Sequence, residues 1–239
     1  MTLTGKHVVV LGGTSGIGLA TAHLASQLGG EVTVASSNPE TVKRALETLP
    51  AATTGEVIDL TDSTQVAGLF DRIGRFDHLI FTAGESLTML ELRGMDLDRA
   101  RKAFELRYFG MLGAVSAAVP HLRPGGSIVL TSGTAGDRPG AGWSIAASLC
   151  GAIDSAVRAM AVELAPLRVN AVKPGVIRSP LWSNLDEQTR TSLYDGSAGS
   201  IPLGRIGETE DVAKAYVYLM NQDFATGTIV TVDGGTVLA

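Results

Sequence analysis

The sequence predicts an α/β fold built on a doubly wound, seven-stranded parallel sheet with helices on both faces, three layers in all. Short runs of β-branched and other apolar residues alternate with helical stretches along the whole chain, which is typical of βαβ units. The connections between them are short, and this favours crossovers onto one sheet. The 239 residues are 45% hydrophobic, enough to bury one large core. We therefore expect a single domain over residues 1–239.

The first half of the chain contains four predicted strands. The run 8–11 has four apolar residues, typical of a strand buried on both faces, and glycines followed by the Ala-rich run 19–28 indicate a turn and a helix. The next elements follow the same alternation. They are a strand at 31–36, a helix at 39–49 with Pro39 in its first turn, a strand at 56–59, a helix that Asp62 or Ser63 caps and that ends at 73, and a strand at 77–82.

The second half repeats the alternation with longer helices. The expected elements are a helix at about 98–121, a strand at 127–132, a helix at about 144–165, a strand at 168–172, a helix at 208–220 and a strand at 228–232. Residues 181–200 show no strong period and end in a run of Gly, Ser and Ala. We interpret them as a mobile lid whose Leu181, Trp182, Leu185 and Leu193 offer an apolar wall to a substrate.

A glycine-rich turn lies between the first strand and the first helix. Gly12, Gly16 and Gly18 are spaced so that the chain can turn sharply, phosphates can approach bare backbone and the helix can pack closely on its strand. The free N–H groups and the positive dipole end of the helix then face the pyrophosphate of a dinucleotide. Any tight turn needs glycine, but the strand before and the helix after this one favour a Rossmann-type nucleotide site.

The composition excludes several classes of partner and site. The formal charge is −5 and no long basic run is present, so we expect no nucleic-acid partner. Cys150 is the only cysteine, and the four histidines show no metal-site spacing with it, so we expect neither an intrachain disulfide nor a metal. Apolar runs fall short of the ~20 residues of a membrane helix, and the N-terminus is unlike a signal peptide. We expect a cytoplasmic protein with no membrane partner.

Six segments in order along nearly the whole chain resemble motifs of the short-chain dehydrogenase/reductase family. They are 12–18, which has the Gly-x-x-x-Gly-x-Gly turn; 59–62, the adenine-contacting segment; 82–84, Thr-Ala-Gly where the family usually has Asn-Asn-Ala-Gly; 168–179, the nicotinamide segment; 201–207; and 226–235. The resemblance implies a Rossmann-type fold, a nicotinamide cofactor and a small-molecule substrate. It also implies assembly as a homodimer or homotetramer through the two long helices, on which small residues recur.

The resemblance implies which residues bind the cofactor. They are Gly12, Thr14, Ser15, Gly16, Ile17, Gly18, Ser36, Ser37, Asn38, Asp59, Leu60, Ala83, Gly84, Pro174, Gly175, Ile177 and Ser179. An acidic residue at the end of the second strand would bind the ribose 2′-hydroxyl and repel a 2′-phosphate. This chain instead has a neutral Ser-Ser-Asn segment there, with Lys43 and Arg44 one helical turn later, so NADP(H) is favoured over NAD(H). The same segment also suits a polar turn and a helix cap.

The family's catalytic Asn, Ser, Tyr and Lys are missing from the matching positions. In that family the Lys charge lowers the Tyr pKa, and the phenol exchanges the proton that accompanies hydride transfer. Counting along the similar segments places Arg107 at the Asn position and Gly133, just after Ser132, at the Ser position. Ala146 stands at the Tyr position and Cys150 at the Lys position. The sequence therefore predicts a non-standard active site, with Cys150 a small packing residue.

Two hypotheses follow from these departures. In the first, the protein is an NADP(H)-dependent oxidoreductase of a carbonyl or alcohol, and Arg107, Ser132 or Lys173 stabilises charge on the reduced oxygen while water supplies the proton. The simpler alternatives are an ion pair for Arg107, a turn hydroxyl for Ser132 and a solvated strand end for Lys173. In the second hypothesis, the fold binds nucleotide as a catalytically silent or regulatory module. The intact nicotinamide segment favours the first.

Overall fold

A computed structural model describes residues 1–87 and 89–239 of the chain. Its central sheet has seven parallel strands in the order β3-β2-β1-β4-β5-β6-β9, so the predicted doubly wound sheet is confirmed. The strands are β1 His7–Leu11, β2 Glu31–Ser36, β3 Thr54–Val57, β4 Phe76–Phe81, β5 Leu122–Thr131, β6 Arg168–Pro174 and β9 Ile229–Val232. The order reverses between β1 and β4, and ligands of such sheets bind beside that switch point at the carboxyl ends of the strands.

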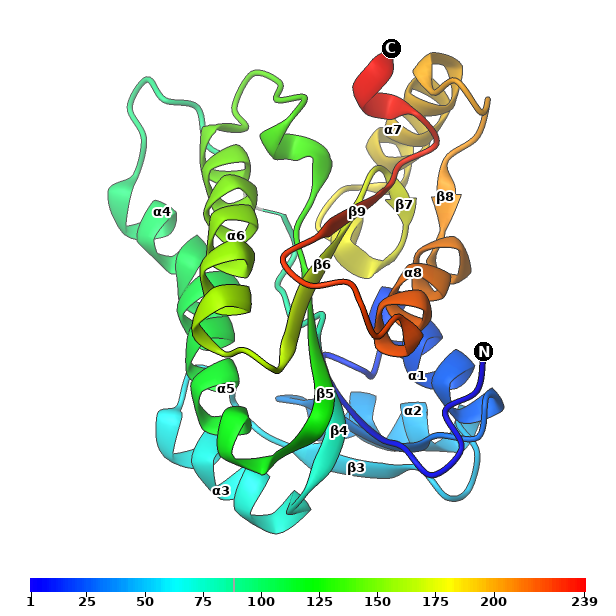
Figure 1. The fold of residues 1–239 in the computed structure, drawn as a ribbon. Coiled ribbons are helices and arrows are strands. Elements are labelled where there is room, and N and C mark those ends of the chain that lie inside the picture. Colours follow the sequence, from blue (N-terminus) through cyan, green and yellow to red (C-terminus); the bar gives the residue numbers. More distant parts are fainter. Residues whose placement is uncertain (88) are drawn as a thin grey trace.

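Helices cover both faces of the sheet (Figure 1). One face carries α1 Gly16–Gln27, α2 Pro39–Thr48 and α8 Thr209–Asn221; the other carries α3 Ser63–Ile73, α5 Met111–Ala118 and α6 Ser144–Glu163, with α4 Leu97–Phe104 beside α6. The strand residues alternate between the two layers. Val9 packs with α3, α5 and α6, whereas Val8 and Val10 pack with α1 and α8, and all three are fully buried. Each such side chain contributes roughly 1.5–3 kcal/mol by its burial.

The third strand lies two residues earlier than predicted, at Thr54–Val57 instead of 56–59. It pairs with β2, and Val57 lies opposite Ser36, the last residue of that strand. Ile58, which lies beyond this point, is still buried, and this explains why its apolar side chain fits a strand pattern.

The predicted helix 98–121 is divided into four pieces. After α4, residues Glu105–Gly110 form a π-helical turn, α5 follows, and Val119–His121 form a 3₁₀ turn. Pro120 explains the final turn, because a proline removes a helical N–H donor. π-Helical turns place side chains out of the α-helical register and are frequent at functional sites. Arg107 lies in the middle of this one.

The segment 181–200, for which the sequence predicts no regular element, is largely regular. Its role as a lid stays a prediction. A 3₁₀ turn spans Pro180–Trp182 and helix α7 spans Glu187–Ser200. The Asp186 side chain caps α7 by accepting from the Thr189 N–H at 2.9 Å, and this cap compensates for the small residues in the helix. Two short strands, β7 Ile177–Arg178 and β8 Gly207–Glu208, pair beside α7 and were not predicted, because two residues carry no period.

Helix α6 is long and apolar enough to meet the length and composition criteria for a membrane span. In the fold, however, one stripe of this helix is part of the core. The stripe contains Leu149, Ile153 and Val157, which belong to the same core cluster as residues of α3, α5 and the sheet. α6 thereby brings its first turns to the carboxyl end of β5, at the top in Figure 1.

Candidate functional site

The glycine turn has the close backbone contacts that its spacing predicted. Gly12 has a φ of +84°, and a β-carbon there would lie 2.5 Å from the Ala83 nitrogen. A β-carbon at Gly18 would overlap the carbonyl oxygen of Gly12. Larger residues at these two positions would force β1, β4 and α1 apart. The glycines therefore bring the N-terminus of α1 directly to the switch point.

The N-terminus of α1 is suited to bind an anion. Ser15 is its N-cap residue, and within the described part of the chain its side chain makes no capping hydrogen bond. The first N–H groups of α1 are therefore available, and the first turn carries no acidic residue to compete for them. A β-carbon on Gly16 would be 3.2 Å from Pro180 Cδ, so Ser179 and Pro180 form the facing wall.

A cluster of neutral hydroxyl groups lies at the carboxyl end of β2. Thr41 Oγ1 is 3.2 Å from Ser36 Oγ and 3.3 Å from Thr14 Oγ1. The Asn38 side chain accepts from the N–H groups of Glu40, at 2.9 Å, and Thr41, and so caps α2. The helix cap and the cluster of neutral hydroxyl groups thus coexist. Thr41 was missed by sequence reasoning, although its position two residues after Pro39 places it in the first turn of α2.

The segment after β3 is folded onto itself. Asp59 Oδ1 accepts from the backbone N–H of Thr61 at 2.9 Å and from its hydroxyl at 2.7 Å. Leu60 is buried, and its carbonyl oxygen would be 3.1 Å from a β-carbon on Gly110. The lack of a side chain at Gly110 therefore lets the helical segment 105–118 approach this end of the sheet.

Arg107 reaches from the π-helical turn to the end of β4. Its guanidinium lies against Gly84, where a β-carbon would be 2.6 Å from Arg107 Cζ, and Nη2 donates a hydrogen bond to the carbonyl oxygen of Glu85. Burial lowers the pKa of Arg107, and the nearby Cys150 and Glu85 act in the opposite direction. The structure therefore brings Arg107 to the Ala83-Gly84 segment, at the carboxyl end of β4.

Ser132 and Cys150 meet where β5 faces α6. Ser132 Oγ donates to the Cys150 carbonyl oxygen at 3.3 Å, and a β-carbon on Gly133 would lie 3.2 Å from Cys150 Sγ. Burial raises the pKa of the Cys150 thiol, and the Asp154 carboxylate raises it further. Ala146, one turn before Cys150, lines a small cavity that it shares with Arg107.

Lys173 is buried, so the alternative of a solvated strand end is wrong for this residue. Its Nζ lies 2.6 Å from Asp137 Oδ2 and 2.7 Å from Asp154 Oδ2. Burial by itself would lower the pKa of Lys173, but the hydrogen bonds to Asp137 and Asp154 outweigh it and raise the pKa. The two aspartates were missed because they come from segments distant from Lys173 in sequence.

The nicotinamide segment is tied to the last strand. Gly175 N–H donates to the Val232 carbonyl oxygen at 3.0 Å, and a β-carbon there would be 2.7 Å from Asp233 Cβ. Pro174 ends β6, and Ile177 is buried against Gly207. The end of β6 is therefore fixed against the end of β9, at the carboxyl ends of the strands.

The segment 180–184 contacts the segment after β4. Leu87 N–H donates to the Leu181 carbonyl oxygen at 3.4 Å, and Asn184 Nδ2 donates to the Leu87 carbonyl oxygen at 3.3 Å. Trp182 is buried in an apolar cluster with Tyr194, and Leu87, Leu181, Leu185 and Leu193 pack against that cluster. The predicted apolar residues of the lid are thus brought together above the carboxyl ends of the strands.

Comparisons with known proteins agree along nearly the whole chain. A family model described as enoyl-(acyl carrier protein) reductase matches residues 12–237. The chain is 36% identical over 252 residues to short-chain dehydrogenase/reductase ATR9 of Stachybotrys chlorohalonatus, with 99% of each chain covered. A solved small-chain dehydrogenase in complex with NADPH has a TM-score of 0.87 at 32% identity, covering 98% of this chain and 99% of that one. The MalC reductase/Diels-Alderase of Malbranchea aurantiaca has a TM-score of 0.91 at 29% identity, covering 99% and 98%.

Proposed function

The chain belongs to the short-chain dehydrogenase/reductase family of oxidoreductases, and we propose from this premise that it uses NADP(H) to reduce a carbonyl, or oxidise an alcohol, on a small molecule. The observation that carries the proposal is the glycine turn against Ala83, which opens the N-terminus of α1 at the switch point. When bound, the cofactor supplies or accepts the hydride. The chain's own residues bind the diphosphate, exclude water and stabilise the charge that develops on the substrate oxygen.

The preference for NADP(H) over NAD(H) is supported by the edge at Ser36. Ser36, Ser37, Thr41 and the capped start of α2 offer hydroxyl and N–H donors to a 2′-phosphate. Residues 36–39, directly at and after the end of β2, carry no carboxylate that would repel a 2′-phosphate or bind a 2′-hydroxyl; Glu40 follows in the first turn of α2. One solved relative is described as an NADPH complex, which agrees with this assignment.

We further propose that the active site departs from the usual family set. Arg107, Gly133, Ala146 and Cys150 occupy the four positions, so no phenol and lysine pair is present there to exchange a proton. Arg107 can stabilise an oxyanion electrostatically, and Ser132 can donate a hydrogen bond to it. Lys173 is held by Asp137 and Asp154, so we assign it a positioning role: it fixes the 134–138 segment and α6 relative to the end of β6.

Two titrations and a substrate panel test this proposal. Cofactor fluorescence should show NADPH binding at least about ten-fold tighter than NADH, the effect of one lost charged hydrogen bond. Aldehydes and ketones are then screened for NADPH oxidation. If neither nucleotide binds, the proposed function is wrong. If NADPH and NADH bind with equal affinity, the proposed preference for NADP(H) is wrong. Binding without turnover across a broad panel would favour the silent, regulatory alternative, which the loss of all four positions also supports.

We further propose that the protein forms a homodimer or homotetramer through the helical segment 105–118 and α6. Two apolar side chains of these segments are exposed, Phe109 in the π-helical turn (62%) and Val162 on α6 (81%). Close contact between copies would remove this apolar surface from water. Analytical ultracentrifugation should show a dimer or tetramer, and a monomer at micromolar concentration would contradict it.

A further inference from the structure

Arg107, which is partly buried, differs from the buried Arg168 in how its charge is compensated. Arg168 donates to two carbonyl oxygens at the C-terminal end of α8, those of Leu219 at 2.7 Å and Met220 at 3.0 Å. That helix end carries partial negative charge, which compensates the cation. For Arg107, the residues 1–87 and 89–239 supply one acceptor, the carbonyl oxygen of Glu85, and no carboxylate within ion-pair distance.

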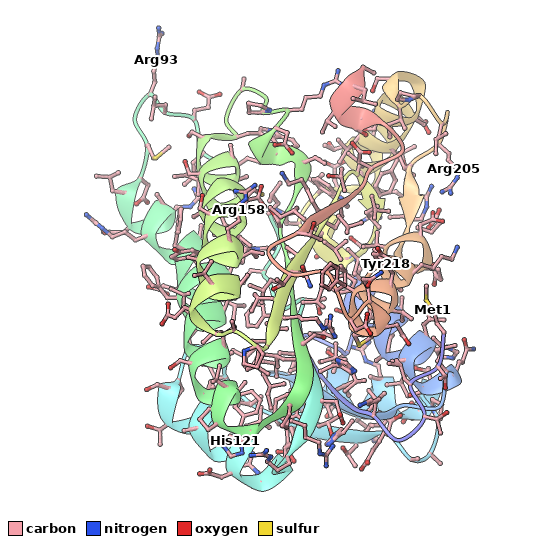
Figure 2. The ribbon with its side chains drawn as sticks, in the orientation of Figure 1. Met1, Arg93, His121, Arg158, Arg205 and Tyr218 are labelled. Atoms are coloured by element: carbon pink, nitrogen blue, oxygen red, sulfur yellow. The ribbon has the colours of Figure 1, made fainter. Side chains whose placement is uncertain are left out.

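The charges of two arginines on the surface of the molecule are compensated by water or by a carboxylate. Figure 2 shows Arg93 projecting from the loop before α4, where water solvates its charge. Arg101, on α4, is exposed and pairs with Asp98 at 2.7 Å. Arg107 is partly buried and forms no ion pair with a carboxylate of the described residues, and burial lowers its pKa. A guanidinium kept in such a place has N–H donors available for an anion.

The surroundings of Arg107 place these donors at the reaction site. Its guanidinium lies against Gly84, at the carboxyl end of β4 and next to the switch point. The small cavity beside it is lined by Ile145, Ala146 and Leu149 of α6, and also by Glu85, Ser86, Leu87 and Ala103. A ligand that enters it therefore meets a planar cation together with the aliphatic side chains of α6.

We propose that Arg107 binds a carboxylate of the substrate, and that the substrate is an oxo acid with an apolar remainder. A guanidinium fork matches the two oxygens of a carboxylate in one plane. In a 2-oxo acid the carbonyl to be reduced is on the neighbouring carbon, so one guanidinium can bind the carboxylate and reach the reacting oxygen. This inference rests on the proposed hydride transfer and adds the substrate class to it.

The reaction balances without any additional redox partner. The hydride of the reduced cofactor forms the new C–H bond at the oxo carbon, and the electron pair of the C=O π bond moves to oxygen. Water protonates that oxygen, so the products are the hydroxy acid, oxidised cofactor and hydroxide. The carboxylate is unchanged and remains on Arg107 throughout.

Binding of a matched pair of probes tests the inference on the full-length protein. Calorimetry should find 3-phenylpropionate bound at least about ten-fold tighter than 3-phenylpropanamide, with or without NADP⁺, because only the acid offers a charged pair of oxygens. The ratio should fall to about one in Arg107→Gln and stay unchanged in Arg101→Gln, the control on α4. Equal binding of the two probes to the unaltered protein, or an unchanged ratio in Arg107→Gln, would overturn the inference.

A second variant and a kinetic comparison separate this role from other roles of Arg107. Arg107→Lys keeps the charge but lacks the two parallel N–H donors of the guanidinium, so the ratio of the affinities for the acid and the amide should also fall. If Arg107→Gln does not fold, this variant tests the inference in its place. In turnover, Arg107→Gln should raise KM for phenylpyruvate and leave KM for its methyl ester unchanged. An equal fall of kcat for both, with KM unchanged for both, would mean oxyanion stabilisation alone and would overturn carboxylate binding. NADPH fluorescence titration tests the proposed function separately from all of these.

Discussion

The two halves of the candidate site, one around β1 and β2 and one around β4, β5 and β6, are built by different means. The half around β1 and β2 depends on backbone: glycines that allow close approach, open N–H groups at α1 and a capped turn before α2. The half around β4, β5 and β6 depends on side chains from distant segments, with Arg107 against Gly84 and Lys173 between two aspartates. Backbone requirements leave a local sequence pattern, whereas a charge cluster does not. The reaction chemistry can therefore change while the nucleotide half stays the same.

Removing the charge of Lys173 should have the largest effect. Lys173→Met leaves the largely buried Asp154 without its cation, and breaking such a pair costs about 3–5 kcal/mol in the free energy of unfolding. Urea denaturation measures this loss. Asp137→Asn is the control: because Asp137 is half-exposed, this substitution should lower the free energy of unfolding by under about 1 kcal/mol. A Lys173→Met protein as stable as the parent would mean that the reaction half does not depend on this cluster.

Adding one carbon atom at Gly18, in the half around β1 and β2, should have the second-largest effect. Gly18→Ala forces the new methyl group against the Gly12 carbonyl and should cost about 1–3 kcal/mol, with NADPH binding weakened as the turn shifts. Gly196→Ala in α7 is the control: nothing lies within 4 Å of its β-carbon position, and alanine there should stabilise the helix by roughly 0.5–1 kcal/mol. Normal NADPH affinity in Gly18→Ala would contradict a turn defined by backbone contact.

Cofactor choice should respond to a single side chain at the edge of the nucleotide half. Ser36→Asp places a carboxylate at the end of β2, where it repels a 2′-phosphate and accepts from a 2′-hydroxyl. We expect the ratio of NADPH to NADH affinity to fall by about ten-fold or more, the equivalent of about 1.4 kcal/mol. Fluorescence titration with both nucleotides measures it, and Ser63→Asp at the start of α3 is the control. An unaltered ratio would place the discriminating contact elsewhere.

The same contrast explains what the sequence predicted and what it did not. Val8 to Leu11 and the glycine turn after them carry short-range patterns, so the strand and the turn were predicted, whereas the contact of Gly12 with Ala83 was not. The π-helical turn around Arg107 was not, because the segment keeps an apolar pattern that fits an unbroken helix. Lys173 was named as a candidate, but its aspartate partners became visible only when folding brought β6, α6 and the 134–138 segment together.

The smallest expected effect is that of the Asp154 charge on the pKa of the Cys150 thiol, in the half around β4, β5 and β6. Asp154 raises the pKa of the Cys150 thiol, after burial, while Arg107 and Lys173 lower it. Asp154→Asn removes the raising charge and leaves both cations, so the thiol pKa should fall and more thiolate should be present at a fixed alkaline pH. Thiol modification followed across pH should be a few-fold faster in Asp154→Asn, with its midpoint moved to lower pH. Asp195→Asn on α7 serves as the control, since it changes the same charge away from Cys150. If both variants react alike, Asp154 supports the packing of α6 without acting on the charge of the thiol.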